Sequence, residues 1–220
     1  MTESLELPLE PLRLVVVSAG LRQPSSTRLL ADRLAASAER ALDRQGRATQ
    51  PRVIELRELA TDIAHNLVTG FPNETLSEAL KAVENADGLI VVSPIFSASY
   101  SGLFKSFFDL IDPEALGGTP VLIAATGGSA RHSLALEHAL RPLFSYLHAT
   151  VVPTGVYAAT EDWGASSGAE SVDLGGRIDR ATAELAALLT FGVSKQRRER
   201  LTEDYDDVVP FEELLARQQM

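Results

Sequence analysis

The chain has 220 residues, of which 45% are hydrophobic and 23% charged, and it carries a formal net charge of −10 at pH 7. This length allows one domain with a full hydrophobic core, and the acidic balance argues against a broad surface for nucleic acid or membrane. The absence of cysteine excludes disulfides, thiolate catalysis and cysteine-bound metals, and it fits a cytoplasmic location.

Apolar runs of strand length alternate with segments of helical periodicity along most of the chain. Residues 1–11 predict a flexible leader without the features of a secretory signal, and no apolar run approaches the roughly 20 residues that cross a bilayer. The pattern then predicts, in order, strand 12–17, loop 18–27, helix 29–42, strand 53–56, loop 65–73, helix 75–86, strand 88–92, helix 102–111, strand 121–125, helix 133–147, strand 151–157, loop 159–175 and helix 178–189. Thr75 with Glu78 resembles a capping box for the second of these helices.

The predicted strands are continuous apolar runs, so both faces of their sheet are expected to be covered by helices. Strands that alternate with helices predict a doubly wound α/β domain, here over residues 12–191. Five strands favour the flavodoxin-like parallel order 2-1-3-4-5 over a six-stranded dinucleotide-binding fold. In such sheets the ligand lies outside the carboxyl ends of the strands, where the strand order reverses.

The loop at 18–27, SAGLRQPSST, is the candidate phosphate loop. It offers hydroxyls and one cation just where the amides of the following helix have no partner, and those amides and the helix dipole attract an anion. The candidate ligands are Ser18, Arg22, Ser25, Ser26 and Thr27. No GxGxxG and no Gly-Lys-Ser/Thr is present, which favours a monophosphate over a dinucleotide or a nucleoside triphosphate. The structural alternative is that Ser25 only caps the helix.

Two further loops follow strands 88–92 and 121–125, and we name them the first and second ring loops. The first comprises Ser93, Pro94, Ile95 and Phe96, and the second comprises Thr126, Gly127, Gly128 and Ser129. Backbone amides can meet the edge of a flat heteroaromatic ring, and glycine lets the backbone approach closely because it has no Cβ. Either loop alone could be a simple turn, but beside a phosphate loop the two predict bound flavin mononucleotide (FMN).

These residues resemble a known family, the NAD(P)H-dependent FMN reductases, and most closely the flavin reductase components of two-component monooxygenases. The similarity covers about residues 12–190 and rests on the segments ADGLIVVS, SPIFSASYSGLFKSFFDLI and ATGGSARHSLALEHALRPLFSYLHA. The family's phosphate loop usually reads Gly-Ser-x-Arg-x-x-Ser-x-Asn; Arg22 and Ser25 match it, while Thr27 stands in place of the Asn.

The resemblance implies hydride transfer from NADPH or NADH to FMN and delivery of the reduced flavin to a partner monooxygenase. It places the first ring loop near the flavin N5 and O4 edge and the second at the pyrimidine edge. No catalytic side chain is assigned, because the flavin carries the chemistry. Relatives can carry an inserted aromatic residue or histidine that forms a π-bulge near the flavin, and His138 is the candidate here. The alternative is an ordinary histidine on the helix surface.

Three alternatives stay open at this point. One is a quinone, azo or metal-ion reductase with resident FMN, the second a flavodoxin-like electron carrier, and the third a flavin-free interaction subunit. Carriers tend to stack aromatic side chains on both flavin faces, whereas Trp163 is the sole tryptophan and lies in the late loop. The intact second ring loop disfavours a flavin-free subunit. His65, His132 and His148 lack the spacing of metal ligands, so no metal site is predicted.

The helix at 102–111 carries Phe104, Phe107 and Phe108 around most of its circumference, which favours burial against a second subunit in a homodimer or homotetramer. Lys105 and Asp109 are four apart, which indicates an ion pair on the same helix. The resemblance implies an alternative, because the family packs this helix against its twin in a dimer and the two charges could serve that interface. Residues 192–220 form a charged C-terminal segment, interpreted either as a solvated tail or as a docking arm that uses its apolar set, Val208, Val209, Phe211, Leu214 and Leu215.

Overall fold

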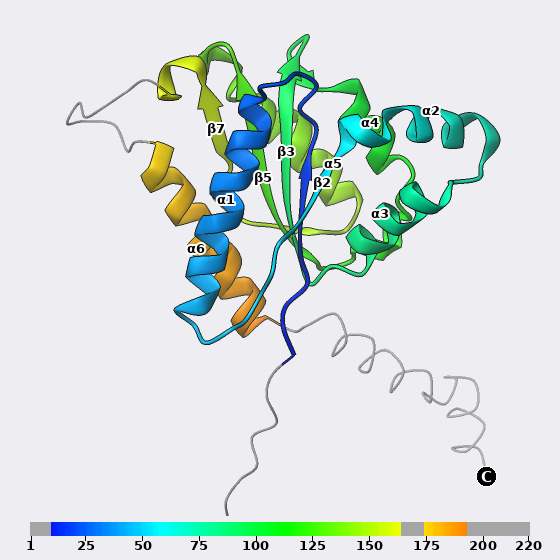
Figure 1. The fold of residues 1–220 in the computed structure, drawn as a ribbon. Helices are drawn as coiled ribbons and strands as arrows, with labels where there is room; N and C mark the ends of the chain where they lie inside the picture. The colour runs from blue at the N-terminus through cyan, green and yellow to red at the C-terminus, as the bar shows by residue number, and fades with distance from the viewer. Residues whose placement is uncertain (1–9, 164–173, 193–220) are drawn as a thin grey trace, which may run out of the picture.

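The computed structural model describes residues 10–163 and 174–192 as one layered α/β unit (Figure 1). Its elements are, in chain order, β1 (Leu14–Ser18), α1 (Ser26–Asp43), β2 (Arg52–Glu55), η1 (Leu56–Leu59), α2 (Ala60–Thr69), α3 (Glu74–Glu84), β3 (Gly88–Phe96), β4 (Ser99–Tyr100), α4 (Gly102–Phe108), η2 (Pro113–Leu116), β5 (Pro120–Gly127), η3 (Ala130–His132), η4 (Leu136–Leu140), α5 (Arg141–Tyr146), β6 (Thr150–Val151), β7 (Val156–Ala159), η5 (Thr160–Trp163) and α6 (Leu174–Phe191).

The sheet runs β2-β1-β3-β5, and all of these neighbours are parallel. The fifth and last position of the order is shared by β6 and β7, which both pair with β5. The predicted order 2-1-3-4-5 is confirmed. The predicted strand 151–157 is split into two, because Pro153 lacks a donor for the ladder and the chain rejoins β5 only at Val156.

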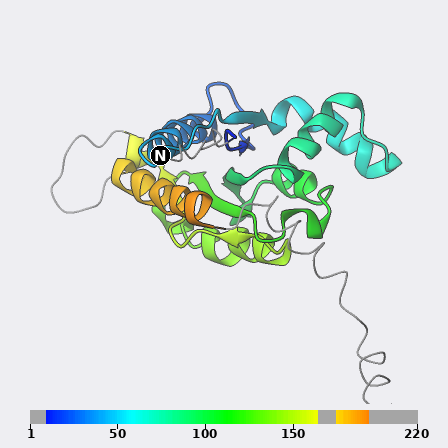
Figure 2. The same ribbon diagram turned by 90° about the horizontal axis from the view of Figure 1, so that it is seen from below.

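Helices cover both faces of the sheet, as the continuous apolar strands predict (Figures 1 and 2). Alternate strand residues face opposite layers. Val16 and Ile90 pack with α1 and α6, which lie side by side, whereas Val17 and Val91 pack with α3, α4 and α5. The central strands are therefore buried on both sides, and only their ends are open to a ligand.

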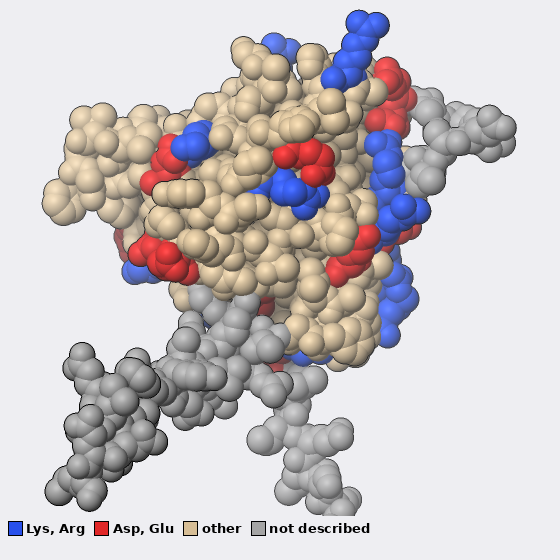
Figure 3. All heavy atoms as spheres, turned by 180° about the vertical axis from the view of Figure 1, so that it is seen from behind, with Lys and Arg blue, Asp and Glu red and all other residues tan. Residues whose placement is uncertain are grey.

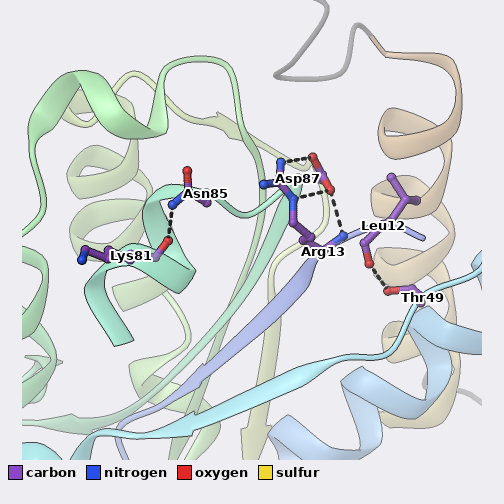
Figure 4. Close-up of polar contacts among 6 residues, drawn as sticks. All are labelled: Leu12, Arg13, Thr49, Lys81, Asn85 and Asp87. Atoms are coloured by element: carbon purple, nitrogen blue, oxygen red, sulfur yellow. Dashed lines mark hydrogen bonds and ion pairs between the residues drawn. The ribbon is translucent and has the colours of Figure 1, made fainter. Parts of the chain in front are cut away.

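At the amino edge of the sheet the strands are tied together by polar contacts (Figure 4). Arg13 donates to Asp87 from its backbone N at 2.8 Å, from Nε at 3.2 Å and from Nη2 at 3.0 Å, which joins the starts of β1 and β3. Thr49 Oγ1 donates to the carbonyl of Leu12 at 2.8 Å. Asn85 Nδ2 donates to the carbonyl of Lys81 at 2.8 Å, next to this edge.

The region around α2 differs from its prediction. Residues 65–69, predicted as loop, form the second half of α2, which ends at Gly70 with a left-handed φ of 79°. Asn73 is the N-cap of α3, and its Oδ1 accepts a hydrogen bond from the amide of Leu76 at 3.0 Å, so the predicted capping box at Thr75 is wrong. Asn73 reaches the free amides of the first turn from outside the helix, whereas Thr75 already lies within it.

The predicted helix 133–147 consists of a π-helix (η4) followed by α5, and the short η3 precedes it. The π-bulge expected around His138 is confirmed, and the His138 side chain is exposed. The predicted helix at 178–189 is longer and runs from Leu174 to Phe191.

The aromatic side chains of α4 are buried within the same chain. Phe104, Phe107 and Phe108 are at most 1% exposed, and Phe108 lies 5.0 Å from Phe144 of α5, centroid to centroid, with their rings edge to face. Burial against a second subunit is therefore wrong for these rings, because α2, α5 and the sheet already surround α4. The predicted ion pair of Lys105 with Asp109 is confirmed.

Several predictions fall on other parts of the chain. Residues 1–9 and 193–220, which include most of the predicted leader 1–11 and the C-terminal apolar set, lie outside the described residues, as does the 164–173 part of the predicted late loop. Within the described ranges, no helix combines the length and the apolar character needed to cross a membrane. Likewise, no group of His, Asp and Glu in those ranges is arranged to hold a metal ion.

Candidate functional site

The three predicted loops meet at the carboxyl edge of the sheet. Ser18 ends β1 opposite Val92 of β3, and Pro94 of β3 lies opposite Thr126 of β5. The hydroxyls of Thr27 and Thr126, both buried, lie 2.8 Å apart and join the start of α1 to the end of β5. The phosphate loop and the second ring loop are therefore in direct contact.

The phosphate loop folds tightly against the first turn of α1. Ser25 is the N-cap, and its Oγ accepts a hydrogen bond from the amide of Arg28 at 3.2 Å. An added Cβ at Gly20 would lie 2.1 Å from that Oγ, so a larger residue there would displace the cap. Gly20 is not among the predicted site residues. Its need for a missing Cβ depends on the position of Ser25, which only the folded loop shows.

Ser18 presents an unpaired hydroxyl at the base of this loop. It is 1% exposed, and its Oγ has no hydrogen-bond partner among the described residues. Because strand side chains alternate, Ser18 lies on the same face as Val16, which packs toward α1. Buried polar atoms are nearly always hydrogen-bonded, so a polar ligand group at the start of α1 fits this hydroxyl.

Arg22 and Arg28 lie in and next to the phosphate loop, and they differ in their partners. Arg28 donates to Asp32 at 2.8 Å and also to Glu55. The hydrogen bond to Asp32, and the charges of both carboxylates, raise the pKa of Arg28 and neutralise its charge locally. Arg22 is exposed within the loop itself, and Ser26 beside the cap is exposed as well. Arg22 is therefore a cation of the loop itself that is available to an anion.

The first ring loop is part of a hairpin rather than a loop after a short strand. β3 continues to Phe96 and returns as β4, with Ile95 opposite Tyr100. Ser93 is buried, donating through Oγ to the carbonyl of Pro94 at 2.9 Å and accepting from the amide of Ser101 at 3.0 Å. Its hydroxyl thus holds the hairpin together, whereas Phe96 is 48% exposed and free to contact a ring.

The tip of this hairpin is strained. Ser97 has φ of 49° and Ala98 has φ of 66°. A two-residue turn with positive φ at both central positions is the usual hairpin connection, but Asn and Gly normally occupy it. The sequence offers no such signal, which is why the hairpin escaped prediction. Backbone strain of this kind concentrates at ligand and active sites.

The second ring loop uses its two glycines differently. Neither Gly127 nor Gly128 has a positive φ, so neither is needed for a left-handed turn. An added Cβ at Gly127 would lie 2.0 Å from the hydroxyl of Tyr157, whereas one at Gly128 would meet nothing within 4 Å. Gly128 therefore faces open space. Ser129 Oγ accepts from the amide of Arg131 at 3.3 Å and caps η3.

Comparisons with known proteins show the family to which this chain belongs. Residues 12–164 match the protein family described as NADPH-dependent FMN reductase. An FMN reductase (NADPH) from Pseudomonas aeruginosa is 44% identical over 153 residues, covering 70% of this chain and 80% of that protein. The NADH-dependent FMN reductase SfnE from Pseudomonas putida is 41% identical over 179 residues, covering 81% of this chain and 92% of that protein.

Solved structures extend the similarity to three dimensions. An oxidoreductase from Corynebacterium diphtheriae has a TM-score of 0.77 at 49% identity, covering 81% of this chain and 96% of its own. The apo form of the NADH:FMN oxidoreductase EMOB has a TM-score of 0.67 at 31% identity, covering 79% and 87%. A WrbA-like flavodoxin from Agrobacterium tumefaciens has a TM-score of 0.55 at 17% identity over 80% and 95% of the two chains, and it supports the flavodoxin-like fold alone.

Proposed function

This chain belongs to the NADPH-dependent FMN reductase family and is an NAD(P)H:FMN oxidoreductase, and we propose that it delivers its reduced flavin to a partner monooxygenase. The observation that best supports this site is the hydrogen bond between the hydroxyls of Thr27 and Thr126, which joins the phosphate loop to the second ring loop. That contact brings the start of α1, which can bind an anion, next to the open second ring loop with its glycines. FMN carries a phosphate at one end and a flat ring at the other, so it needs both features.

We assign the phosphate of FMN to the unpaired Ser18 hydroxyl, the exposed Arg22 and the first turn of α1 with Ser25 and Ser26. The α1 amides and the helix dipole favour a negative charge there. The net charge of −10 supplies no general attraction for an anion, so these local donors carry the binding.

We assign the flavin ring to the space between Phe96 and Gly128. Ile95 and Phe96 lie at one edge, and Gly128 and Ser129 at the other. Ser93, Thr27, Thr126 and Gly127 support these contacts from behind, because their side chains or missing Cβ atoms are committed to the protein. Bound FMN supplies the hydride chemistry. The chain's own residues bind it, orient its ring and leave one ring face open to the nicotinamide.

Both nicotinamide donors are represented among the relatives, NADPH in the Pseudomonas aeruginosa protein and NADH in SfnE. We therefore keep both as substrates of this chain. The partner oxygenase is supported by the resemblance of segments 93–111 and 125–149 to the reductase components of two-component systems. A cytoplasmic reaction agrees with the absence of cysteine.

We also propose a homodimer or homotetramer. The α4 aromatic rings do not support it, because they are buried within one chain. The exposed apolar side chains of Leu134 and Tyr146, which are 62% and 70% exposed, support it instead. On the face turned away from the viewer in Figure 1, charged side chains are scattered over a largely uncharged surface (Figure 3). Light scattering at micromolar concentration tests this, and a mass near 23.7 kDa would contradict it.

Steady-state oxidation of NADH and NADPH, with and without added FMN, tests the function. A reductase that releases its flavin is expected to be strongly stimulated by free FMN. The competing function is a quinone, azo or metal-ion reductase with resident FMN. Such a protein would purify yellow, would show no stimulation by FMN, and would need a second acceptor for turnover.

A further inference from the structure

Tyr157 of β7 reaches from the sheet into the second ring loop. It lies opposite Ala125 in the parallel pair with β5, is 5% exposed, and belongs to the core that α3, α4 and α5 cover. Its side chain passes Gly127, and its hydroxyl donates to the carbonyl of Ser129 at 2.9 Å. A residue 28 positions further along the chain thus holds the turn that faces the proposed flavin.

Gly127 and Tyr157 fit each other closely. The Cβ that any other residue would add at position 127 lies 2.0 Å from the Tyr157 hydroxyl and 3.1 Å from Cζ. Because the φ of Gly127 is not positive, this close approach is the reason that glycine is needed there. The Tyr157 hydroxyl therefore occupies the space next to Gly127 and leaves Gly128 as the open glycine of the loop.

The backbone and charges around Tyr157 keep the side chain in place and protonated. Arg177 of α6 donates from Nη1 to the carbonyl of Tyr157 at 2.6 Å and pairs with Asp162, whose Oδ2 accepts from the amide of Ala159 at 2.7 Å. Burial, with smaller contributions from the negative charges of Glu161 and Asp162, raises the pKa of Tyr157. The phenol is thus a hydrogen-bond donor throughout the physiological range.

We propose that Tyr157 is a positioning residue for the pyrimidine edge of the flavin: by holding the carbonyl of Ser129, it sets how far Gly128 and the following amides stand from the ring. The inference rests on the proposed FMN site. It assigns to that site a residue that lies outside all three loops and that touches the loop backbone rather than the ligand. Its loss should affect the ring and leave the phosphate contacts unchanged.

Tyr157→Phe tests this, with Tyr146→Phe as the matched control because Tyr146 is 70% exposed on α5. The affinities for FMN and for riboflavin, measured by quenching of flavin fluorescence, should both weaken about tenfold in Tyr157→Phe, the effect of one lost buried hydrogen bond. The melting temperature should change by less than about 3 °C, since the ring stays and Ser129 is only partly buried. Tyr146→Phe should change none of these values.

A purely structural role predicts the opposite pattern, namely a lower melting temperature with unchanged affinity for both flavins, and that result overturns the inference. A weakening of FMN without riboflavin also overturns it, because the phosphate end would then be affected. If the wild-type protein binds neither flavin, the proposed function itself fails. If the wild type binds both and Tyr157→Phe binds them equally well, only this inference fails.

A second variant keeps the test decisive if Tyr157→Phe folds poorly. Gly127→Ala should weaken flavin binding because its Cβ displaces the Tyr157 hydroxyl. In Gly127→Ala/Tyr157→Phe the hydroxyl 2.0 Å from the new Cβ is gone and Cζ at 3.1 Å needs only a small shift, so this double variant should bind flavin nearly as well as Tyr157→Phe alone. Fully additive losses would show that Gly127 and Tyr157 act independently, which contradicts the inference.

Discussion

The side-chain hydroxyls of Thr27 and Thr126 lie 2.8 Å apart although 99 residues separate them in the chain. Thr27 is 3% exposed in the first turn of α1, and Thr126 is 4% exposed near the end of β5. One hydrogen bond thus connects the helix start that we assign to the phosphate with the loop that we assign to the ring. It sets the distance between the two ends of the site.

Replacing both threonines by valine tests this connection. Thr27→Val and Thr126→Val should each lower the free energy of unfolding, because each leaves the other hydroxyl buried and unpaired. The double variant should lose less than the sum of the two, with a coupling of about 1 kcal/mol in urea denaturation. Ser26→Ala, which removes an exposed hydroxyl of the same turn, is the control and should couple to neither. Additive single effects would contradict the connection.

Ser25→Ala should weaken FMN more than riboflavin. Its hydroxyl caps α1 and, in our assignment, also meets the phosphate that riboflavin lacks. We expect a loss of about 1 kcal/mol or more in FMN affinity, together with a similar loss of stability from the missing cap. Asn73→Ala removes the corresponding cap of α3 and should cost similar stability without changing either flavin affinity. Equal losses for FMN and riboflavin in Ser25→Ala would contradict the phosphate assignment.

Gly128→Val should abolish FMN binding while leaving the circular dichroism and the oligomeric state nearly intact. The new Cβ meets no protein atom within 4 Å, so the loop can hold it, but it enters the space that we assign to the flavin. Gly88→Val is the contrasting variant, because its Cβ would lie 2.8 Å from Leu189 Cδ2 at the far edge of the sheet. It should lower the melting temperature and spare FMN affinity. A Gly128→Val protein that melts early and still binds FMN would remove Gly128 from the ring site.

Ala98→Gly should stabilise the protein. Ala98 has φ of 66° at the hairpin tip, where an L-residue with a Cβ costs about 1–2 kcal/mol and glycine does not. Glycine also makes the unfolded chain more flexible, and this entropy offsets part of the gain. We expect a net increase of about 0.5–1 kcal/mol in the free energy of unfolding. Ala36→Gly, at an exposed position of α1, should instead lose about 1 kcal/mol. A loss in Ala98→Gly would show that the tip is not strained.

The predicted sheet and its ligand edge followed from the sequence because their signals are local. The apolar runs at 88–92 and 121–125 have no polar face to expose, so they require cover on both sides, and their burial agrees. Helix 29–42 was predicted from apolar spacing, and Leu30, Leu34 and Ala38 are indeed buried. Parallel strands bring their carboxyl ends to one edge, so the loops that follow them had to meet.

Elements with weak local signals were decided by tertiary contacts. The second half of α2 buries only Asn66, too little for a visible apolar stripe, and it is held against α4. The β3–β4 hairpin turns through Ser97 and Ala98 without a glycine. Likewise, the Phe residues of α4 indicated burial but not its partner. That partner is Phe144 of α5, which the sequence could not place beside them.

The sequence by itself determined which residues stand at the carboxyl edge of the sheet, because alternating apolar strands and helices leave these loops no other place. Only the tertiary structure decided what their side chains do there. The hydroxyl of Ser93 holds the hairpin, and the missing Cβ of Gly127 makes room for Tyr157. A side chain's free donors and free space depend on its neighbours from distant parts of the chain, and those are set only when the sheet and its helices pack.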